Sequence, residues 1–455
     1  MQKIRHLYRR TAFAPKVSEV QAALPLTLES CVNGLLSPQP VPTALLWASD
    51  LPFPTPLTNE QQQIYNQRRR ELREWWIRLM LTQAPSLTEK MTLFWHGHFA
   101  TQVSDVKVPQ HMVRQNALFR QYASGNFKDL VKAVAIDPAM LLYLDGHQNK
   151  VGNPNENFAR ELLELFTMGV DNYTQFDIQE AARAFTGWRV SGLDSSFVSS
   201  RHDFGVKTFL GHTGNFTGND IIDIIFEQPV TARFICRKLY KFFVYEAVNE
   251  QIIDQLSVIL RNNNYKISSV LEALLKSSHF FDPMFLGADI SGPVERSVGA
   301  IRQLNITVDP LSTVVPKFVR TETPDMGQEL LEPPNVAGWP GYRQWISTTT
   351  LLLRNAFTDA IVTGRNINNN DIGFEVDPIA FAQQFSSPND VFQLVTDICD
   401  HLIPLPINAA RKDVLVQTLL QGIDPGDWSL AYPEAGARIT NLLKVVFRMA
   451  EYQLD

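Results

Sequence analysis

Apolar residues recur at helical spacing along most of the chain, so the α-helix is its dominant predicted element. The clearest pattern runs from residue 58 to 81, where Leu72 and Trp76 belong to a series of apolar side chains at helical intervals. Ser86 and Glu89 have the spacing of a capping box, which predicts that another helix begins at Ser86. The same periodicity predicts further helices over residues 108–123, 127–135, 156–168, 177–185, 229–240, 249–262, 267–277, 294–304, 351–363 and 435–453.

One segment departs from the helical pattern. Residues 187–218 are rich in Gly, Ser and Thr and contain three short β-prone runs. Such runs between turn-forming residues predict a small β-hairpin insertion. The expected fold is therefore mainly α, with a multi-helical globular body made of residues 1–186 and 219–455.

Composition narrows the class of protein. The formal net charge is −6, whereas nucleic-acid binders usually carry a basic face, so no nucleic-acid partner is expected. No apolar run reaches the ~18 residues that a membrane-spanning helix requires, so no integral membrane segment is expected either. The three cysteines are far apart and form no Cys-x-x-Cys pair, which argues against a disulfide framework or a thiolate zinc site.

The amino-terminal residues bear on the compartment. The pair Arg9-Arg10 is similar to part of a twin-arginine export signal. The stretch that follows, PKVSEVQAALPLTLE, is too polar to form the apolar region of such a signal. We therefore expect a cytoplasmic protein, or an exported (periplasmic or secreted) one whose leader is missing from this sequence.

Two histidines in the segment FWHGHF, His96 and His98, are candidate metal ligands. At this spacing they point about 200° apart on a helix, so they share a ligand only if Gly97 ends the helix or the segment is extended. His-x-His is a known ligand arrangement for metals. Alternatively, each ring donates to a backbone carbonyl and has a structural role.

The predicted helix over residues 156–168 has one polar face, formed by Asn157, Arg160, Glu161 and Glu164. Two carboxylates, one guanidinium and one amide can hold a metal or position a substrate, as helix-borne carboxylates do in bundle-type metal sites. The alternative is an exposed ladder of i, i+4 ion pairs that contributes little beyond local helix stability.

Two further segments carry candidate chemistry. His202 and Asp203 are adjacent in the predicted insertion, and such pairs occur in metal sites and in acid–base catalysis, although a turn explains them equally well. Trp339 and Trp345 lie in and after the proline-rich segment EPPNVAGWPG, whose indoles offer large flat surfaces. That loop either walls a pocket and stacks on a sugar, or plugs the helical body.

These segments together are similar to one bacterial family. The motifs are FWHGHF, DPAMLLYLDGHQN, NPNENFARELLELFTMG, YTQFDIQEAARAFTGW, HDFGVKTFLG and PPNVAGWPG. They resemble the DUF1800 family over nearly the whole chain, which implies one family unit spanning residues 1–455. The resemblance implies no established reaction, cofactor or catalytic residue. Family members are often exported and tend to accompany a second family, so a protein partner of sulfatase-like or phosphatase-like fold is expected.

The main functional hypothesis is a metal-dependent enzyme, hydrolytic or oxidative. Its active site requires that the fold brings the side chains of these segments together. Zinc, iron or manganese would polarise the substrate or activate water, and a spare carboxylate would act as base. The substrate is unspecified. The residues assigned are His96, His98 and His202 as metal ligands, Glu161, Glu164, Arg160 and Asp203 as catalytic groups, and Asn157, Trp339 and Trp345 as substrate-binding groups.

Two alternatives compete with the enzyme. The first is a non-catalytic assembly or carrier protein that binds a protein or polysaccharide through the loop of Trp339 and Trp345, or through the helix of Trp75 and Trp76. The second is a purely structural role, in which the polar signature holds the fold together through buried hydrogen-bond networks.

Overall fold

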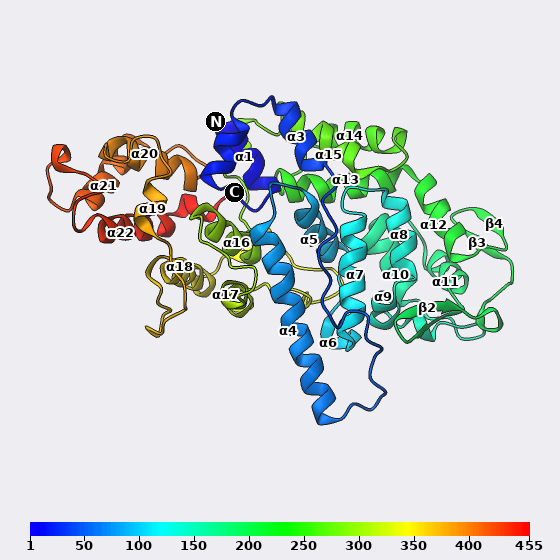
Figure 1. Cartoon of the computed structure of the whole chain (residues 1–455). Helices are drawn as coiled ribbons and strands as arrows, with labels where there is room; N and C mark the ends of the chain where they lie inside the picture. Colours follow the sequence, from blue (N-terminus) through cyan, green and yellow to red (C-terminus); the bar gives the residue numbers. More distant parts are fainter.

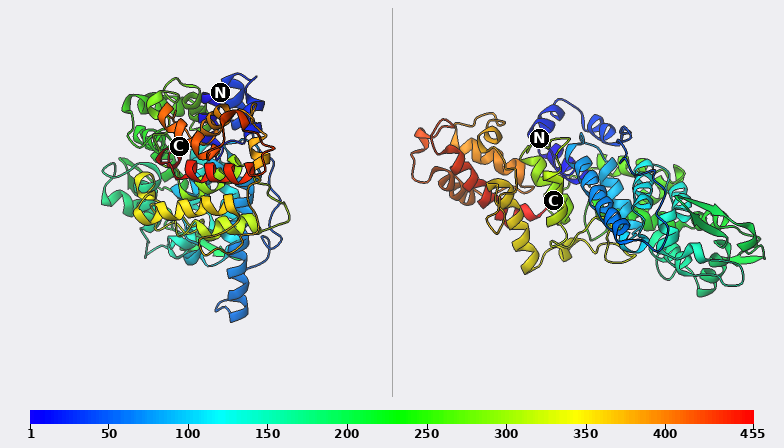
Figure 2. Two further views of the ribbon diagram at one scale, coloured as in Figure 1. Left: turned by 90° about the vertical axis from the view of Figure 1, so that its left-hand side faces the viewer. Right: turned by 60° about the horizontal axis from the view of Figure 1, so that its bottom comes forward.

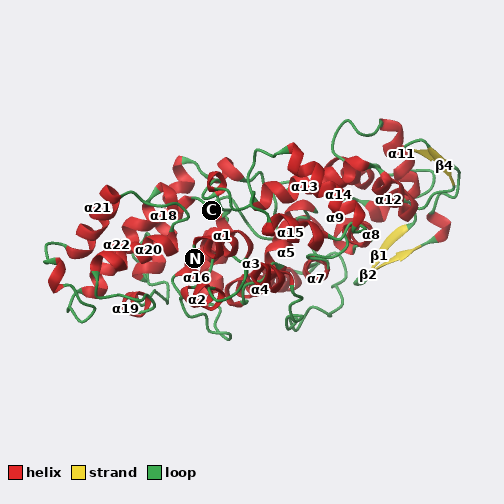
Figure 3. Cartoon of the chain, turned by 90° about the horizontal axis from the view of Figure 1, so that it is seen from above, coloured by secondary structure: helices red, strands yellow, loops and turns green.

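A computed structural model describes all residues from 1 to 455 and confirms a mainly α protein. It has 22 α-helices and two antiparallel two-stranded sheets. The molecule is elongated, with α20, α21 and α22 at one end and the strands at the other (Figures 1 and 2). Seen from above, helices fill nearly its whole length and the four strands lie close to one tip (Figure 3).

Helices precede and follow the four strands along the chain. The first part contains α1 (Gln2–Thr11), α2 (Val17–Ala23), α3 (Leu28–Leu36), α4 (Asn59–Thr82), α5 (Thr88–His98), α6 (Val103–Val106), α7 (Pro109–Gln121), α8 (Phe127–Ala135), α9 (Pro138–Tyr143), α10 (Asn157–Glu161) and α11 (Gln175–Ala184). The strands are β1 (Trp188–Ser191), β2 (Asp194–Phe197), β3 (Lys207–Phe209) and β4 (His212–Gly214). The rest comprises α12 (Gly218–Glu227), α13 (Pro229–Phe243), α14 (Glu250–Asn262), α15 (Ile267–Lys276), α16 (Pro293–Gln303), α17 (Val314–Glu322), α18 (Thr348–Thr363), α19 (Pro378–Ala382), α20 (Val391–Leu402), α21 (Ala409–Leu420) and α22 (Ala435–Arg448).

Two hydrophobic clusters of similar size form the interior. The first has 56 buried residues and includes the apolar faces of α3, α5, α8 and α11 to α15. The second has 52 and is formed mainly by α4 and α16 to α22. Burial of these faces supplies the main driving force for folding. The body is thus built around two neighbouring cores.

Helix α1 lies where the two clusters meet, close to the carboxyl end of the chain (Figure 1). The Arg9 guanidinium donates to the carbonyls of His401 and Leu402, at 3.0 and 2.9 Å, on the side of the second cluster. Arg10 donates to the Phe243 carbonyl at 3.0 Å on the side of the first. Both arginines are buried, so these bonds satisfy donors that would otherwise be costly inside the protein.

The start of α5 differs from the prediction. The helix begins at Thr88, and the Ser86 hydroxyl accepts from the Thr88 N–H at 3.1 Å. The Glu89 carboxylate instead accepts from the Arg120 guanidinium, at 2.6 and 2.9 Å, and from the Trp76 indole N–H at 2.8 Å. The predicted capping box is therefore wrong. The Glu89 carboxylate that would have accepted from the backbone of Ser86 is bound by Trp76 and Arg120.

The β-prone segment forms two hairpins, β1 with β2 and β3 with β4. The second hairpin is bound to α11, where Glu180 accepts from the Thr208 N–H and Asp177 from the Leu210 N–H, both at 2.8 Å. The predicted insertion is therefore present and is tied by hydrogen bonds to the helical body.

Of the helices described above, none combines the length and the apolar character needed to cross a membrane.

Candidate binding cleft

His96 is fully enclosed and already has a partner. Its side chain is 1 % exposed, and its Nε2 accepts a hydrogen bond from the Leu331 N–H at 3.1 Å. The ring contacts the Trp76 and Trp339 indoles edge-on, with centroids 5.4 and 5.3 Å away. Burial, assisted by the nearby charge of Arg73, lowers the pKa of His96 to about 3. The ring is therefore a neutral acceptor that holds the backbone at Leu331.

His98 is also buried, one residue beyond Gly97 at the end of α5. Its Nε2–H donates to the Phe166 carbonyl at 3.0 Å, near the end of the π-helical turn Leu162–Thr167. The last carbonyls of a helix lack donors of their own, so this bond satisfies one of them. Burial and the nearby charge of Lys238 lower the pKa of His98 to about 3. Its Nδ1 is buried without a partner.

The predicted helix over residues 156–168 is divided into α10 and the π-helical turn Leu162–Thr167, and its polar side chains make hydrogen bonds to groups other than the two histidines. Arg160 pairs with Glu156 at 2.9 Å, in the i, i+4 arrangement considered from the sequence, and also donates to Gln175 at 3.0 Å. Glu164 accepts from the Tyr173 hydroxyl at 3.1 Å. Burial and the neighbouring charge of Glu164 raise the pKa of Glu161.

Asn157 is exposed at the first position of α10. Its backbone N–H donates to the Asn155 side chain at 2.9 Å, which is a local turn at the helix start.

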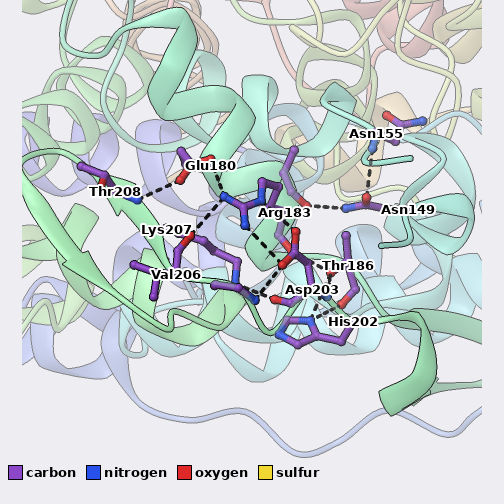
Figure 4. Close-up of polar contacts among 12 residues, drawn as sticks. Asn149, Asn155, Glu180, Arg183, Thr186, His202, Asp203, Val206, Lys207 and Thr208 are labelled. Atoms are coloured by element: carbon purple, nitrogen blue, oxygen red, sulfur yellow. Dashed lines mark hydrogen bonds and ion pairs between the residues drawn. The ribbon is translucent and has the colours of Figure 1, made fainter. Parts of the chain in front are cut away.

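His202 and Asp203 belong to a third environment, shown in Figure 4. His202 Nδ1–H donates to the Thr186 carbonyl at 2.8 Å, while its Nε2 is buried without a partner. Asp203 accepts from the Arg183 guanidinium at 2.8 and 3.3 Å and from the Gly205 N–H at 2.8 Å. The bonds from Arg183, outweighing the cost of burial, lower the pKa of Asp203. This network joins the hairpin segment to α11.

The expected convergence on one metal is therefore not found. No group of three or more His, Cys, Asp or Glu side chains is arranged to hold a metal ion. The physical reason is that the candidate side chains are occupied locally: His96 by Leu331, His98 by Phe166 and Asp203 by Arg183. The residues present do not fit zinc, iron or manganese in the expected arrangement.

A different pair of motifs does come together. The loop containing Gly338 and Trp339 packs against the end of α5, where Trp339 contacts His96. Gly338 has a φ of +82°, and a Cβ at this position would approach the Gly97 carbonyl oxygen well within 3.0 Å. Only glycine allows both the positive φ and this approach of two backbones. The FWHGHF and PPNVAGWPG motifs thus form one packed unit.

Beside this unit lies a cleft of about 370 Å³, where the two hydrophobic clusters meet. Its walls come from α5, α13, α16 and the loop that carries the tryptophans. Clefts of this size, with aromatic walls and a few polar groups, are typical of ligand sites. The lining residues are Leu93, Phe94, Gly97, His98, Lys238, Lys241, Phe242, Glu246, Asp289, Ile290, Glu295, Gln328, Ala337, Trp339, Pro340, Gly341, Tyr342 and Trp345.

Two partly buried carboxylates of the cleft are both paired. Asp289 accepts from the Arg10 guanidinium at 3.0 Å, and burial raises its pKa despite that charge. Glu295 accepts from the Lys90 ammonium and from the Gly292 N–H. Burial alone would raise the pKa of Glu295, but the charge and hydrogen bond of Lys90 hold it below its usual value.

Four polar residues of the cleft, Lys238, Asp289, Glu295 and Gln328, lie outside every motif that the sequence displays. Glu295 has the sequence context of a helix cap, and it does cap α16. Lys238 looks like an ordinary polar position on the amphipathic helix α13. No motif or spacing marks these residues, because only the packing of distant segments brings them to one cleft.

Comparison with known proteins gives one match. A family model described as protein of unknown function (DUF1800) matches residues 6–454. No curated protein and no solved structure matches the chain. The match spans every element from α1 to α22 except the first residues of α1. The chain is therefore a member of the DUF1800 family, as its motifs indicated.

Proposed function

We propose that the protein binds a carbohydrate chain in the cleft beside Trp339 and Trp345. The observation that carries the proposal is the presence of both indoles, with Tyr342, in the wall of a 370 Å³ cleft that also contains charged and amide side chains. Sugar rings present apolar C–H faces and polar hydroxyl edges, so they fit flat aromatic surfaces bordered by hydrogen-bonding groups.

The indole nitrogens support this proposal. Five of the eight indole N–H groups in the protein donate to protein acceptors. Those of Trp339 and Trp345 have no such acceptor, and neither nitrogen is among the buried unpartnered atoms, so both reach solvent. Each nitrogen is free to donate to a ligand oxygen; the half-buried Trp339 also offers part of its ring, whereas Trp345 is only 7 % exposed.

The other aromatic surface considered from the sequence offers less. Trp76 is fully buried and donates to Glu89. The Trp75 indole N–H donates to the Thr43 carbonyl at 3.0 Å. Both indole nitrogens of this helix are used within the protein, so the loop of Trp339 and Trp345 is the better ligand surface.

The metal-dependent enzyme stays a prediction, as does a partner of sulfatase-like or phosphatase-like fold. Elemental analysis of protein purified without chelators tests the first. A stoichiometric metal, lost in a His96→Asn or His98→Asn variant that stays folded, would support it. Protein without metal, whose thermal stability is unchanged by added zinc, iron or manganese, would contradict it.

Binding is tested with Trp339→Ala and a panel of soluble polysaccharides in affinity electrophoresis and calorimetry. Trp188→Ala is a matched control, since Trp188 is also half-buried but belongs to β1 and does not line the cleft. We expect the wild type and the control to bind at least one polymer, and Trp339→Ala to bind about tenfold or more weakly. Equal binding by all three proteins, or no binding to any polymer, would refute the proposal.

A further inference from the structure

We infer that the ligand of this cleft is acidic, and that Lys238 on α13 selects for its negative charge. This inference rests on the proposed carbohydrate site and adds the chemical class of the chain. It comes from the balance between hydrogen-bond donors and acceptors that the cleft leaves unused.

The acceptors of the cleft are already taken. Asp289 is paired with Arg10, Glu295 with Lys90, and Glu246 with Lys241. These carboxylates therefore contribute little net negative charge to a ligand in the cleft. Each carboxylate of the lining already has a cationic partner, so a ligand with positive groups would have to compete with that partner.

Gln328 and His98 also line the cleft, and their acceptor atoms are likewise used or buried. The Gln328 carbonyl oxygen accepts from the Val294 N–H at 2.9 Å, which leaves its amide N–H₂ unused. His98 Nδ1 is an unpartnered acceptor, but it is buried away from solvent. Apart from the second carboxylate oxygen of Glu246 and the Tyr342 hydroxyl oxygen, the lining side-chain groups without a protein hydrogen-bond partner are donors: two indoles, one amide and one ammonium.

The ammonium is that of Lys238, which lines the cleft; Glu246 is the carboxylate near enough to act on its charge, but it is paired with Lys241 and makes no salt bridge to Lys238. It lies over the Phe234 ring, 5.5 Å from the centroid. Burial and the neighbouring charge of Lys241 lower its pKa, so the surroundings disfavour an unpaired charge. An acidic group on the ligand supplies the missing counter-charge, since charge-assisted hydrogen bonds are roughly twice as strong as neutral ones.

A carboxylate or sulfate on a sugar ring meets all these groups at once. Its oxygens accept from Lys238 and from the Gln328 amide, while the ring packs on the indoles. A neutral chain fills the same cleft but leaves the Lys238 charge without a partner. The cleft should therefore distinguish acidic from neutral polymers of the same backbone.

The test uses two matched pairs of polymers: dextran with dextran sulfate, and polygalacturonate with its methyl ester. We expect the wild type to bind the acidic member of a pair more tightly, and Lys238→Met to weaken that binding roughly 10- to 100-fold. Binding of the neutral members should not change. Lys238→Arg should retain most of the affinity, because it keeps the charge.

The control variant is Lys317→Met, which removes the same charge from an exposed position on α17 outside the cleft. Equal weakening by Lys317→Met would show a general charge effect and overturn the inference. Binding of neutral and acidic members with equal affinity, abolished by Trp339→Ala but not by Lys238→Met, would also overturn it while leaving the carbohydrate site intact. If the wild type binds none of the polymers, both proposals fail.

Discussion

Replacing Gly338 by alanine tests the packing contact on which the cleft depends. Gly338 has a φ of +82°, which costs a residue with a side chain roughly 1–2 kcal/mol. The new Cβ would also press on the Gly97 carbonyl oxygen, and relieving such overpacking costs about 1–3 kcal/mol more. We therefore expect Gly338→Ala to lower the free energy of unfolding by about 2–5 kcal/mol.

Gly211, in the turn between β3 and β4, provides the control. It has the same φ of +82°, but a Cβ there meets no atom within 4 Å. Gly211→Ala should thus show only the backbone cost. Urea unfolding, followed by circular dichroism with a common slope, measures both values.

The difference between the two variants reports the contact of the tryptophan loop with α5. An excess of about 1–3 kcal/mol for Gly338→Ala, with weaker polysaccharide binding, is the expected result. Equal losses of stability in the two variants would refute the reasoning, because they would mean that the loop does not pack on α5.

Three further predictions concern the two histidines of FWHGHF, the Glu161 carboxylate and the hydrogen bond between Trp76 and Glu89. The two FWHGHF histidines have a folded pKa of about 3 against about 6.5 when unfolded, so the unfolded chain binds more protons in acid. Burial of the neutral rings therefore costs no stability above pH 6.5, and stability is lost as the pH falls toward 3. Between pH 7 and 5, each histidine should lower the free energy of unfolding by about 2 kcal/mol. A His96→Asn variant should show a pH dependence shallower by that amount in urea titrations, and an unchanged slope would contradict the assignment. Glu161→Gln should raise stability by about 0.2–0.5 kcal/mol at pH 7, since it removes repulsion from Glu164; a loss measured by the same titration would mean that the carboxylate has a stabilising partner. Trp76→Phe should cost about 1.5–3 kcal/mol by removing the buried hydrogen bond to Glu89, and a cost near zero in thermal unfolding would show that the bond contributes little.

Local signals predicted the elements well where local forces decide them. The periodic apolar positions of residues 58–81 correspond to α4, and the Gly-, Ser- and Thr-rich segment after α11 does contain strands. Ser86 and Glu89 show where such signals fail. Their spacing is correct for a cap, but the half-buried Arg120 and the buried Trp76 compete for the same carboxylate.

The candidate site was less predictable for a related reason. Histidines and carboxylates in FWHGHF, the helix after residue 156 and the hairpin segment are typical of ligands, but each has a hydrogen-bond partner close to it in space, and they do not converge. The partners of His96 and His98 lie 235 and 68 residues away in sequence, so no spacing rule identifies them. Trp339 and Trp345 do line a cleft, and their role in binding stays a prediction.

The position of α1 has a consequence for synthesis. Arg10 finds its acceptor 233 residues later, and Arg9 finds its own 393 residues later. At ribosomal rates of about 5–20 residues per second, roughly 20–80 s pass before that last acceptor exists. The apolar side of α1 packs in the first cluster, whose last residue is Phe285, so we expect this side to dock first and the Arg9 guanidinium to stay without its acceptors until the segment around His401 has emerged.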